Sequence, residues 1–426
     1  MATITVTNTN DSGPGSLRNA VAIANPGDTI VFAGPTRNGT ITLTSGPINI
    51  NKTLTINGPG PKISGTTTRI FNISGATNTV TISGLTFENG NDSIGGAILN
   101  DASTLNVVRC TFLNNQSINS GGAIANQNGG TVNISNSSFS RNNSNFGGAI
   151  GNFPDSTVNI SNSTFSNNSA RDGNGGAIAN DGTANITNSS FSGNTASGQG
   201  GAIANDGTVT ILRGTFTGNT ANFGGAVANF APGKISISNS TFSRNSVFTD
   251  GGAISNSGSS SSVNISNSTF SNNSAPNGVG GAITNRDSGT VTITNSSYTS
   301  NTANFGGAIG NFSGSTVNIT NGTFSSNSAA SNGGAISNDG TLTVMRSTFT
   351  NNSAGNFGGA ISNDGNATID RSSFTGNTAG SGGGAIANFP PGKVTITNST
   401  FSNNSEPQIF GVPDPANVED EQDESS

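Results

Sequence analysis

Apolar residues recur along this chain in short groups that are separated by long polar stretches. The most regular group is Gly-Gly-Ala-Ile, once Gly-Gly-Ala-Val, which begins twelve times at intervals of 24 to 29 residues, always with an Asn two residues after the Ile or Val. The first glycines of these groups are Gly95, Gly121, Gly147, Gly175, Gly200, Gly224, Gly251, Gly280, Gly306, Gly333, Gly358 and Gly383. A period of this length is typical of solenoids, in which each repeat is one supersecondary unit.

Two further marks complete each period. One is an aromatic residue with an Asn three residues later, from Phe112 and Asn115 to Phe401 and Asn404. The other is an apolar pair such as Val132-x-Ile134, whose spacing of two places both side chains on one face of a strand. The pair ends five residues before the aromatic in every period, whereas the two other connections vary in length. We therefore expect three short strands per turn, with one fixed corner and two variable corners.

These marks predict an all-β, single-domain parallel β-helix with about 25–26 residues per turn. Gly, Ser, Asn and β-branched residues are too frequent between the marks to favour helices. Identical positions of successive turns should stack about 4.8 Å apart, so that Phe lies on Phe and Asn on Asn. A block of six turns also recurs after 159 residues, since 228–234 reappears in similar form as 387–393. Such duplication favours a structural role over a catalytic one.

The two ends depart from the repeat. Residues 1–79 are expected to form an N-terminal cap with irregular first turns, 80–405 the regular β-helix, and 406–426 a C-terminal cap segment with an acidic disordered tail. Within the first region, 16–24 have helical apolar spacing behind a Ser, which predicts a short capping helix. A first strand is expected at 29–32. Caps are needed because an open β-helix end exposes unpaired strand edges.

The combination of Gly-Gly-Ala-Ile with Phe-x-x-Asn resembles the repeat pair of the polymorphic outer-membrane proteins, the chlamydial adhesin family. The opening Asp-Ser-Gly-Pro-Gly-Ser-Leu-Arg-Asn-Ala at 11–20 is similar to the start of many bacterial surface β-helix proteins. The repeat resemblance covers about residues 80–405. It implies a right-handed β-helix of the pectin lyase-like fold, exposed at the cell surface and acting as an adhesin.

Composition narrows the expected partners and location. The net charge of −6 comes largely from seven acidic residues between Glu406 and Glu424. No basic stripe matches a phosphate backbone, so we expect no nucleic-acid partner. No apolar run approaches about 20 residues, so we expect no transmembrane segment. Residues 1–5 lack the basic and apolar regions of a signal peptide, which leaves the export route open. We nevertheless expect an extracellular or cell-surface protein, because the resemblance implies one.

Candidate catalytic chemistry is sparse. The chain has no His, and polysaccharide-cleaving enzymes need acidic groups gathered around one bond. The turn sequence Asn-Asp-Gly contains Asp181, Asp206, Asp339 and Asp364, for which we favour a turn role over a ligand role. Adjacent pairs such as Arg286-Asp287 are interpreted as solvated. We expect no catalytic residue, no cofactor and no metal, since the calcium-binding nonapeptide pattern is absent from the sequence.

Aromatic residues outside the main column are the candidate binding residues. Each stands just before Gly-Gly, or just after the Asn that follows it, at a corner of variable length. They are Phe146, Phe153, Phe223, Phe230, Phe305, Phe312, Phe357 and Phe389. If exposed, they offer apolar patches to a partner. We favour the simpler interpretation, in which each pair closes its own corner as a local cluster.

The sequence therefore predicts a non-enzymatic structural or adhesive β-helix rod. We expect it to bind a glycan or a cell-surface protein, or to self-associate, through its exposed corners. The alternative is a polysaccharide-active lyase or hydrolase, because one fold can carry unrelated functions.

Overall fold

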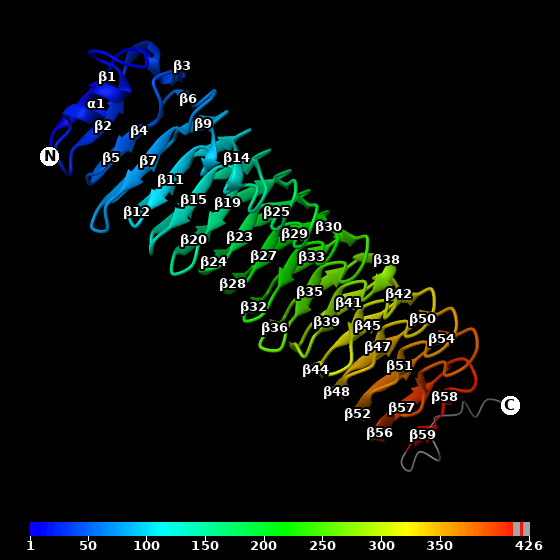
Figure 1. Cartoon of the computed structure of the whole chain (residues 1–426). Helices are drawn as coiled ribbons and strands as arrows, with labels where there is room; N and C mark the ends of the chain where they lie inside the picture. The colour runs from blue at the N-terminus through cyan, green and yellow to red at the C-terminus, as the bar shows by residue number, and fades with distance from the viewer. Residues whose placement is uncertain (412–417, 421–426) are drawn as a thin grey trace. The chain divides into compact units, whose positions relative to one another are not determined.

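The computed structural model describes residues 1–411 and 418–420 of the chain (Figure 1). Most of the expected acidic tail, at 412–417 and 421–426, lies outside the described residues. The chain divides into two compact units, Met1–Thr210 and Ile211–Ser426. Each unit is a stack of β-helical turns with the same plan.

In both units, every strand pairs in parallel with the equivalent strand of the next turn. A regular turn contributes a five-residue strand to sheet A, a three-residue aromatic strand to sheet B, a very short strand to sheet D, and the Gly-Gly-Ala-Ile strand to sheet C. The predicted parallel β-helix is confirmed. Sheet D adds a fourth strand where the sequence predicts only a variable corner, because most of its strands, such as Ser169–Ala170, are too short to produce a periodic signal.

The strands of the first unit group as follows. Sheet A contains β1 (Thr3–Val6), β2 (Thr29–Phe32), β5 (Leu54–Asn57), β8 (Thr79–Ser83), β12 (Thr104–Val108), β16 (Thr131–Ser135), β20 (Thr157–Ser161) and β24 (Thr183–Thr187). Sheet B contains β3 (Thr40–Thr42), β6 (Lys62–Ser64), β9 (Thr86–Glu88), β13 (Thr111–Leu113), β17 (Ser138–Ser140), β21 (Thr164–Ser166) and β25 (Ser190–Ser192). Sheet C contains β4 (Ile48–Ile50), β7 (Phe71–Ser74), β11 (Ile98–Asp101), β15 (Ile124–Gln127), β19 (Ile150–Asn152), β23 (Ile178–Asn180) and β27 (Ile203–Asn205). Sheet D contains β10 (Asn91–Ile94), β14 (Gln116–Ser120), β18 (Asn143–Ser144), β22 (Ser169–Ala170) and β26 (Thr195–Ala196).

The second unit follows the same grouping, and β28 (Thr208–Leu212) contains the boundary residue Thr210. Sheet A contains β32 (Lys234–Ser238), β36 (Ser262–Ser266), β40 (Thr290–Thr294), β44 (Thr316–Thr320), β48 (Thr341–Met345), β52 (Asn366–Asp370) and β56 (Lys393–Thr397). Sheet B contains β29 (Thr215–Thr217), β33 (Thr241–Ser243), β37 (Thr269–Ser271), β41 (Ser297–Thr299), β45 (Thr323–Ser325), β49 (Thr348–Thr350), β53 (Ser373–Thr375), β57 (Ser399–Ser402) and β59 (Val418–Asp420). Sheet C contains β31 (Val227–Asn229), β35 (Ile254–Ser257), β39 (Ile283–Arg286), β43 (Ile309–Asn311), β47 (Ile336–Asn338), β51 (Ile361–Asn363), β55 (Ile386–Asn388) and β58 (Ile409–Phe410). Sheet D contains β30 (Thr220–Ala221), β34 (Ser246–Val247), β38 (Ser274–Val279), β42 (Thr302–Phe305), β46 (Ser328–Ala329), β50 (Ser353–Ala354) and β54 (Thr378–Ala379).

The N-terminal helix α1 (Leu17–Ile23) is the predicted capping helix. Ser16 begins it, because its hydroxyl oxygen accepts a hydrogen bond of 3.2 Å from the backbone N–H of Asn19. The buried side of α1 packs against β1 and β4. Strand β2 is the predicted first strand, but β1 precedes it and pairs with it. A 3-10 helix, η1 (Gly34–Asn38), follows β2. Within the described part of the chain, no helix has the length and hydropathy to cross a bilayer.

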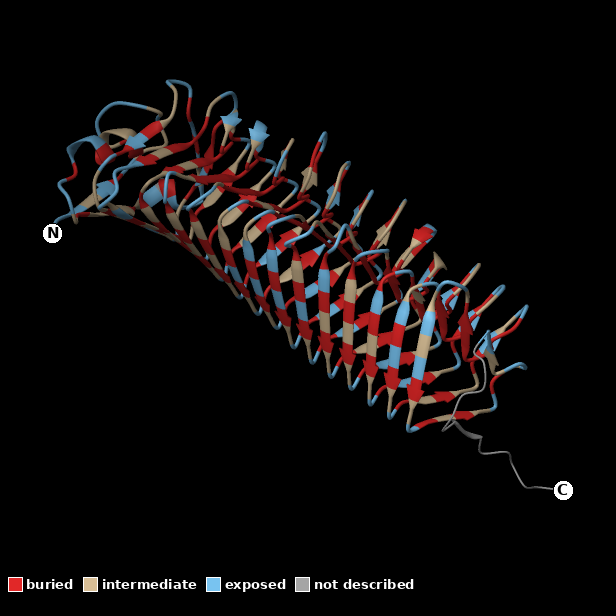
Figure 2. Cartoon of the chain, turned by 60° about the horizontal axis from the view of Figure 1, so that its bottom comes forward, coloured by how far each residue is buried: buried red, intermediate tan, exposed pale blue. Residues whose placement is uncertain are grey.

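The core of each unit consists of stacked side-chain columns. In the first unit the rings of the sheet B column stack with centroid distances of 4.6–4.9 Å, from Phe87 to Phe191. The column of the second unit has the same spacing and contains Tyr298 in place of one Phe. Buried and exposed residues alternate along the strands of sheet A, so one face of each strand joins this core (Figure 2). Each turn thus buries one aromatic ring and several aliphatic side chains.

Asn side chains hold the corners together from one turn to the next. Asn115 donates hydrogen bonds of 3.0 Å from its backbone N–H and from its Nδ2 to Oδ1 of Asn142, and a third from Nδ2 to the carbonyl of Phe87. In sheet C, Nδ2 of Asn126 donates to Oδ1 of Asn152 at 2.9 Å. An Asn amide offers two N–H donors and an acceptor oxygen, whereas an ionised Asp only accepts and a Ser has a single O–H donor. Both Asn columns are therefore structural.

The Gly-Gly pair is required by the backbone. Gly147 has φ +59°, a left-handed conformation that side-chain-bearing residues adopt at a cost. A Cβ on Gly148 would lie 2.2 Å from the carbonyl oxygen of Gly176 in the next turn. The mark that defines the repeat therefore explains the fold and says nothing about a ligand.

Candidate hollows on the outer face of sheet C

The outer face of sheet C has a floor of small side chains. The Ile and Asn of each Gly-Gly-Ala-Ile-x-Asn strand point into the core, so the residue between them faces outward. In the first unit this residue is Gly151 in β19, Ala179 in β23 and Ala204 in β27. Gly151 lies where a Cβ would come 2.1 Å from Oγ of Ser120. The two variable corners rise on either side of this floor.

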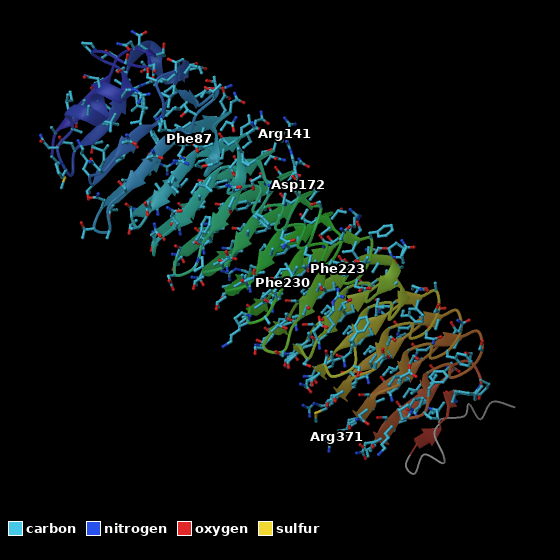
Figure 3. The ribbon with its side chains drawn as sticks, in the orientation of Figure 1. Phe87, Arg141, Asp172, Phe223, Phe230 and Arg371 are labelled. Carbon is cyan, nitrogen blue, oxygen red and sulfur yellow. The ribbon has the colours of Figure 1, made fainter. Side chains whose placement is uncertain are left out.

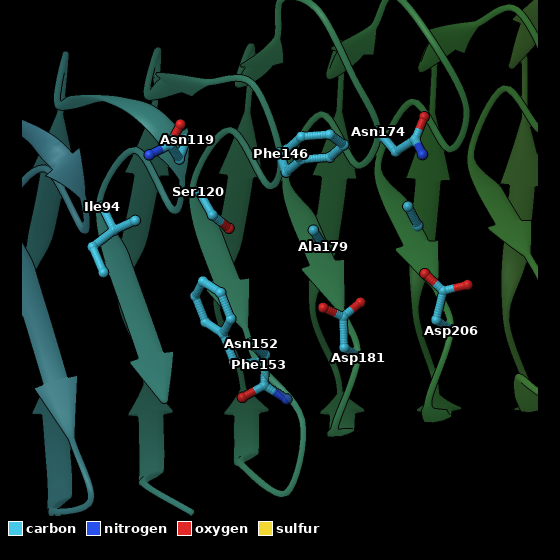
Figure 4. Close-up of a pocket in the computed structure, with 11 residues that line it drawn as sticks. Ile94, Asn119, Ser120, Phe146, Asn152, Phe153, Asn174, Ala179, Asp181 and Asp206 are labelled. Atoms are coloured by element: carbon cyan, nitrogen blue, oxygen red, sulfur yellow. The ribbon is translucent and has the colours of Figure 1, made fainter. Parts of the chain in front are cut away.

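These corners enclose a hollow of about 520 Å³ in the first unit, here called the first hollow. One wall comes from residues just before Gly-Gly and includes Phe146 and Asn174. The opposite wall comes from residues just after the strand and contains Phe153, Asp181 and Asp206 (Figure 4). Residues of several neighbouring turns therefore build both walls.

The second unit contains an equivalent hollow of about 290 Å³, here called the second hollow. Its walls contain Phe305 and Asn332 before Gly-Gly, and Phe312, Asp339 and Asp364 after the strand. The nine residues Asn-Phe-Gly-Gly-Ala-Ile-Gly-Asn-Phe at 145–153 are repeated without change at 304–312. The block duplication that the sequence shows has therefore copied a surface feature as well as a length of core.

The candidate aromatics lie at the surface in both units. Phe146 is 46% exposed, and the other seven are half-buried, namely Phe153, Phe223, Phe230, Phe305, Phe312, Phe357 and Phe389. Four of the eight line the two hollows. The expected contact within a corner pair does not occur for Phe146 with Phe153 or Phe305 with Phe312, since no ring contact joins them among the described residues. Each pair is instead split across the two walls of one hollow.

The four aspartates of the Asn-Asp-Gly sequences lie in bends after sheet C, as predicted, and their carboxylates also line the hollows. The walls remove part of their hydration, which raises the pKa of Asp181 and of Asp206, and the charge of Asp181 raises the pKa of Asp206 further. Partial burial also raises the pKa of Asp339 and of Asp364, and the charge of Asp364 raises the pKa of Asp339 further. Among the described residues, none of the four carboxylates has a hydrogen-bond or ion-pair partner.

A third copy of the same arrangement, around Phe223 and Phe230, is occupied by the chain itself. These residues flank strand β31 (Figure 3). The guanidinium of Arg286 lies 4.4 Å from the centre of the Phe223 ring, and its Nη2 is 3.6 Å from Oδ2 of Asp250. The prediction that Arg286 is a simple solvated charge is wrong, because its side chain crosses the outer face of sheet C and ends on an aromatic ring.

The last aromatic corner is also filled from within. Phe410 in β58 pairs with Ala387 of β55, and the centre of its ring lies 5.5 Å from that of Phe357 and 5.8 Å from that of Phe389. Phe357 and Phe389 themselves meet edge to face at 5.2 Å. The three rings form a cluster that joins Phe357 and Phe389 of neighbouring turns with Phe410.

Other charged groups are not gathered into a site. Arg171 and Asp172 are both exposed in a loop, and Arg371 makes only a 3.8 Å contact with its neighbour Asp370. Across residues 1–411 and 418–420, no group of three or more His, Cys, Asp or Glu side chains is placed to hold a metal ion.

The repeats match a known family. The Chlamydia polymorphic membrane protein repeat matches this chain at 109–127, 162–181, 188–206, 267–286, 321–339, 346–364 and 371–388. The chain is a β-helix protein with polymorphic membrane protein-like repeats. No protein of curated function matches its sequence significantly.

Solved structures that resemble this chain share little sequence with it. The family 6 alginate lyase AlyGC has 12% identity over 94% of this chain and 76% of its own, with a TM-score of 0.34. A mannuronic acid-specific family 6 lyase from human gut microbiota has 13% identity over 76% and 87%, with a TM-score of 0.40. PfbA, a surface adhesin of Streptococcus pneumoniae, has 13% identity over 91% and 87%, with a TM-score of 0.34. Such low scores and identities give no basis for transferring an activity.

Proposed function

We propose that this chain is a non-enzymatic adhesive β-helix that acts outside the cell or at its surface and binds its partner through the hollows on sheet C. The observation that carries the proposal is the repetition of one open hollow in both units, with two surface aromatics facing each other across a floor of small residues. Concave sites with apolar walls and a few polar groups are the usual form of binding pockets. The family repeats fit a surface role.

The proposal is tested by removing the aromatic walls and measuring adhesion. Phe146, Phe153, Phe305 and Phe312 are changed together to Ser, and binding of the full chain to host cells and to a glycan array is compared with that of the unchanged protein. We expect binding to fall strongly while the melting temperature changes little, because these side chains lie outside the stacked core. Phe248, which is 68% exposed and lines neither hollow, provides the control substitution Phe248→Ser. Equal binding by both proteins would refute a role for the hollows.

One observation favours an enzymatic alternative. Asp181 and Asp206 lie on neighbouring turns, and partial burial raises the pKa of each carboxyl, which favours the protonated form that a general acid needs. If the chain cleaves polysaccharides, Asp181→Asn with Asp206→Asn should abolish the release of unsaturated or reducing ends from alginate, pectate and neutral glycans. We expect no turnover by the unchanged protein on any of them.

A further inference from the structure

The three related copies differ at one decisive position. Counting from Phe146, Phe223 and Phe305, the residue after the strand two turns later is Asp206, Arg286 and Asp364 respectively. In the middle copy this residue is the arginine that stacks over Phe223. In the two open copies the same corner carries a carboxylate, and the space between it and the ring belongs to the hollow.

The residue that anchors the arginine charge has changed in parallel. In the occupied copy, Oδ1 of Asp250 accepts a hydrogen bond of 2.8 Å from the backbone N–H of Val279, while Oδ2 faces Arg286. In the first hollow, Oδ1 of Asn174 accepts the equivalent bond, 2.9 Å from the backbone N–H of Gln199. In the second hollow Asn332 does so at 3.3 Å. All three copies therefore share this local backbone. Compared with the occupied copy, the open hollows lack the arginine, and their negative charge lies on the opposite wall.

We propose that each open hollow binds the guanidinium group of an arginine side chain that a partner protein presents. The ring of Phe146 or Phe305 takes the place that Phe223 has under Arg286, and the aspartate pair supplies the opposite charge. The negative face of an aromatic ring attracts a cation, and the attraction strengthens as water is excluded. This inference rests on the proposed adhesive function and names the partner chemistry of the same hollows.

The geometry suits arginine better than an acidic or neutral ligand. Asp181 and Asp206 follow successive strands of sheet C, as do Asp339 and Asp364 across β47 and β51. Positions on successive parallel strands lie about 4.8 Å apart. A planar guanidinium has several N–H donors in a fixed fork, which allows it to meet more than one carboxylate oxygen while one face rests on a ring. An anionic polysaccharide would be repelled by the unpaired carboxylates.

The direct test uses a minimal probe on the full chain. N-acetyl-arginine amide is titrated against the protein and followed by NMR, with N-acetyl-citrulline amide as the uncharged counterpart of the same shape. We expect saturable binding of the arginine probe only. Replacing all four hollow aspartates, at 181, 206, 339 and 364, by Asn should weaken binding by about tenfold or more, because charge-assisted contacts of this kind are lost. Asp172→Asn, which removes an exposed carboxylate outside the hollows, should leave binding unchanged.

A second variant reproduces the occupied copy. In Asp206→Arg with Asp364→Arg, each new arginine should fold over its own Phe as Arg286 does over Phe223, and the probe should no longer bind. This protein should remain folded, with a melting temperature at or above that of the unchanged chain. If the double-Arg variant does not fold, its loss of binding says nothing about the hollows. The four-Asn variant, whose substitutions are nearly isosteric, then decides the test.

The outcomes separate this inference from the adhesive function. Three results would each overturn the arginine assignment. The first is that the citrulline probe binds as well as the arginine probe, and the second is that the four-Asn variant binds the arginine probe fully. The third is a preference for chitosan oligosaccharides, whose cation is an amino sugar. If adhesion depends on the wall phenylalanines but not on the aspartates, the adhesive function is supported and the arginine assignment is refuted. Adhesion that depends on neither would refute both.

Discussion

Asp206 follows Asp181 by one turn, and the charge of Asp181 adds to the burial that raises the pKa of Asp206. A carboxyl with a raised folded-state pKa binds more protons in the folded than in the unfolded chain. Its ionisation therefore lowers stability as the pH rises above the ordinary aspartate value. The unpaired carboxylates of the hollow therefore lower the stability of the folded protein while nothing is bound to them.

We predict that Asp181→Asn with Asp206→Asn raises the melting temperature at pH 7 and has little effect at pH 3, where both forms are uncharged. The gain should be on the order of 0.5 kcal/mol, because the carboxylates are exposed and solvent screens them. Thermal melts at the two pH values measure it. A loss of stability at pH 7 would show that the carboxylates have stabilising partners.

The buried Asn side chains should contribute far more to the free energy of unfolding than Asn side chains that are exposed on the outer surface. Asn168 donates from Nδ2 to Oδ1 of Asn194 and to the carbonyl of Phe139, and its own Oδ1 accepts from Asn142. Asn168→Ala leaves several buried partners without a hydrogen bond, so we expect a loss of about 2–4 kcal/mol in chemical denaturation. The control Asn185→Ala removes an exposed amide that bonds to Asn159, and should cost about 0.5 kcal/mol or less. Similar losses for both would contradict the ladder account.

Tyr298 is the only tyrosine in the chain and stands in the stacked aromatic column. Its hydroxyl is buried and has no hydrogen-bond partner among the described residues, and the ring is fully buried. Removing an unsatisfied buried hydroxyl removes a desolvation penalty, so Tyr298→Phe should stabilise the protein by about 1–2 kcal/mol. Urea denaturation followed by circular dichroism measures this difference. An unchanged or lower midpoint would mean that the hydroxyl is solvated or bonded.

Arg286 should contribute to the stability of the second unit, because it stacks on Phe223 and pairs with Asp250. Arg286→Ala is expected to cost about 1 kcal/mol and to open a third hollow. Arg171→Ala, which truncates an exposed arginine in a loop, is the matched control and should change the melting temperature little. If both substitutions have the same effect, the contact with Phe223 is not stabilising.

The core was predictable from the sequence because its residues recur at fixed distances. The Phe column, the Asn columns and the helix after Ser16 each follow from spacing and from simple hydrogen-bonding chemistry. Sheet D was not predictable, since two-residue strands have no period of their own. The corner aromatics were identified, but their arrangement across two walls was not.

The sequence did not predict that the aspartate pairs line the hollows or that Arg286 contacts Phe223, and the reason is physical. Whether Asp206 meets Phe146 or Arg286 meets Phe223 depends on how far each corner protrudes, and corner length varies from turn to turn. One signal was present, because the segment 145–153 recurs intact at 304–312 with Gly in the middle of the strand. That Gly makes room for the side chain of Ser120 in the first hollow and of Val279 in the second, whereas the copy at 222–230 has Ala.

The residue after a sheet C strand lies outside the stacked core, yet it decides whether the space beside it is vacant or bridged, as it is by Arg286. A single codon change at this place can thus open or close a hollow without disturbing the stack beneath it. Lengthening the chain by whole turns multiplies such places, so that the outer surface can vary while the architecture stays the same.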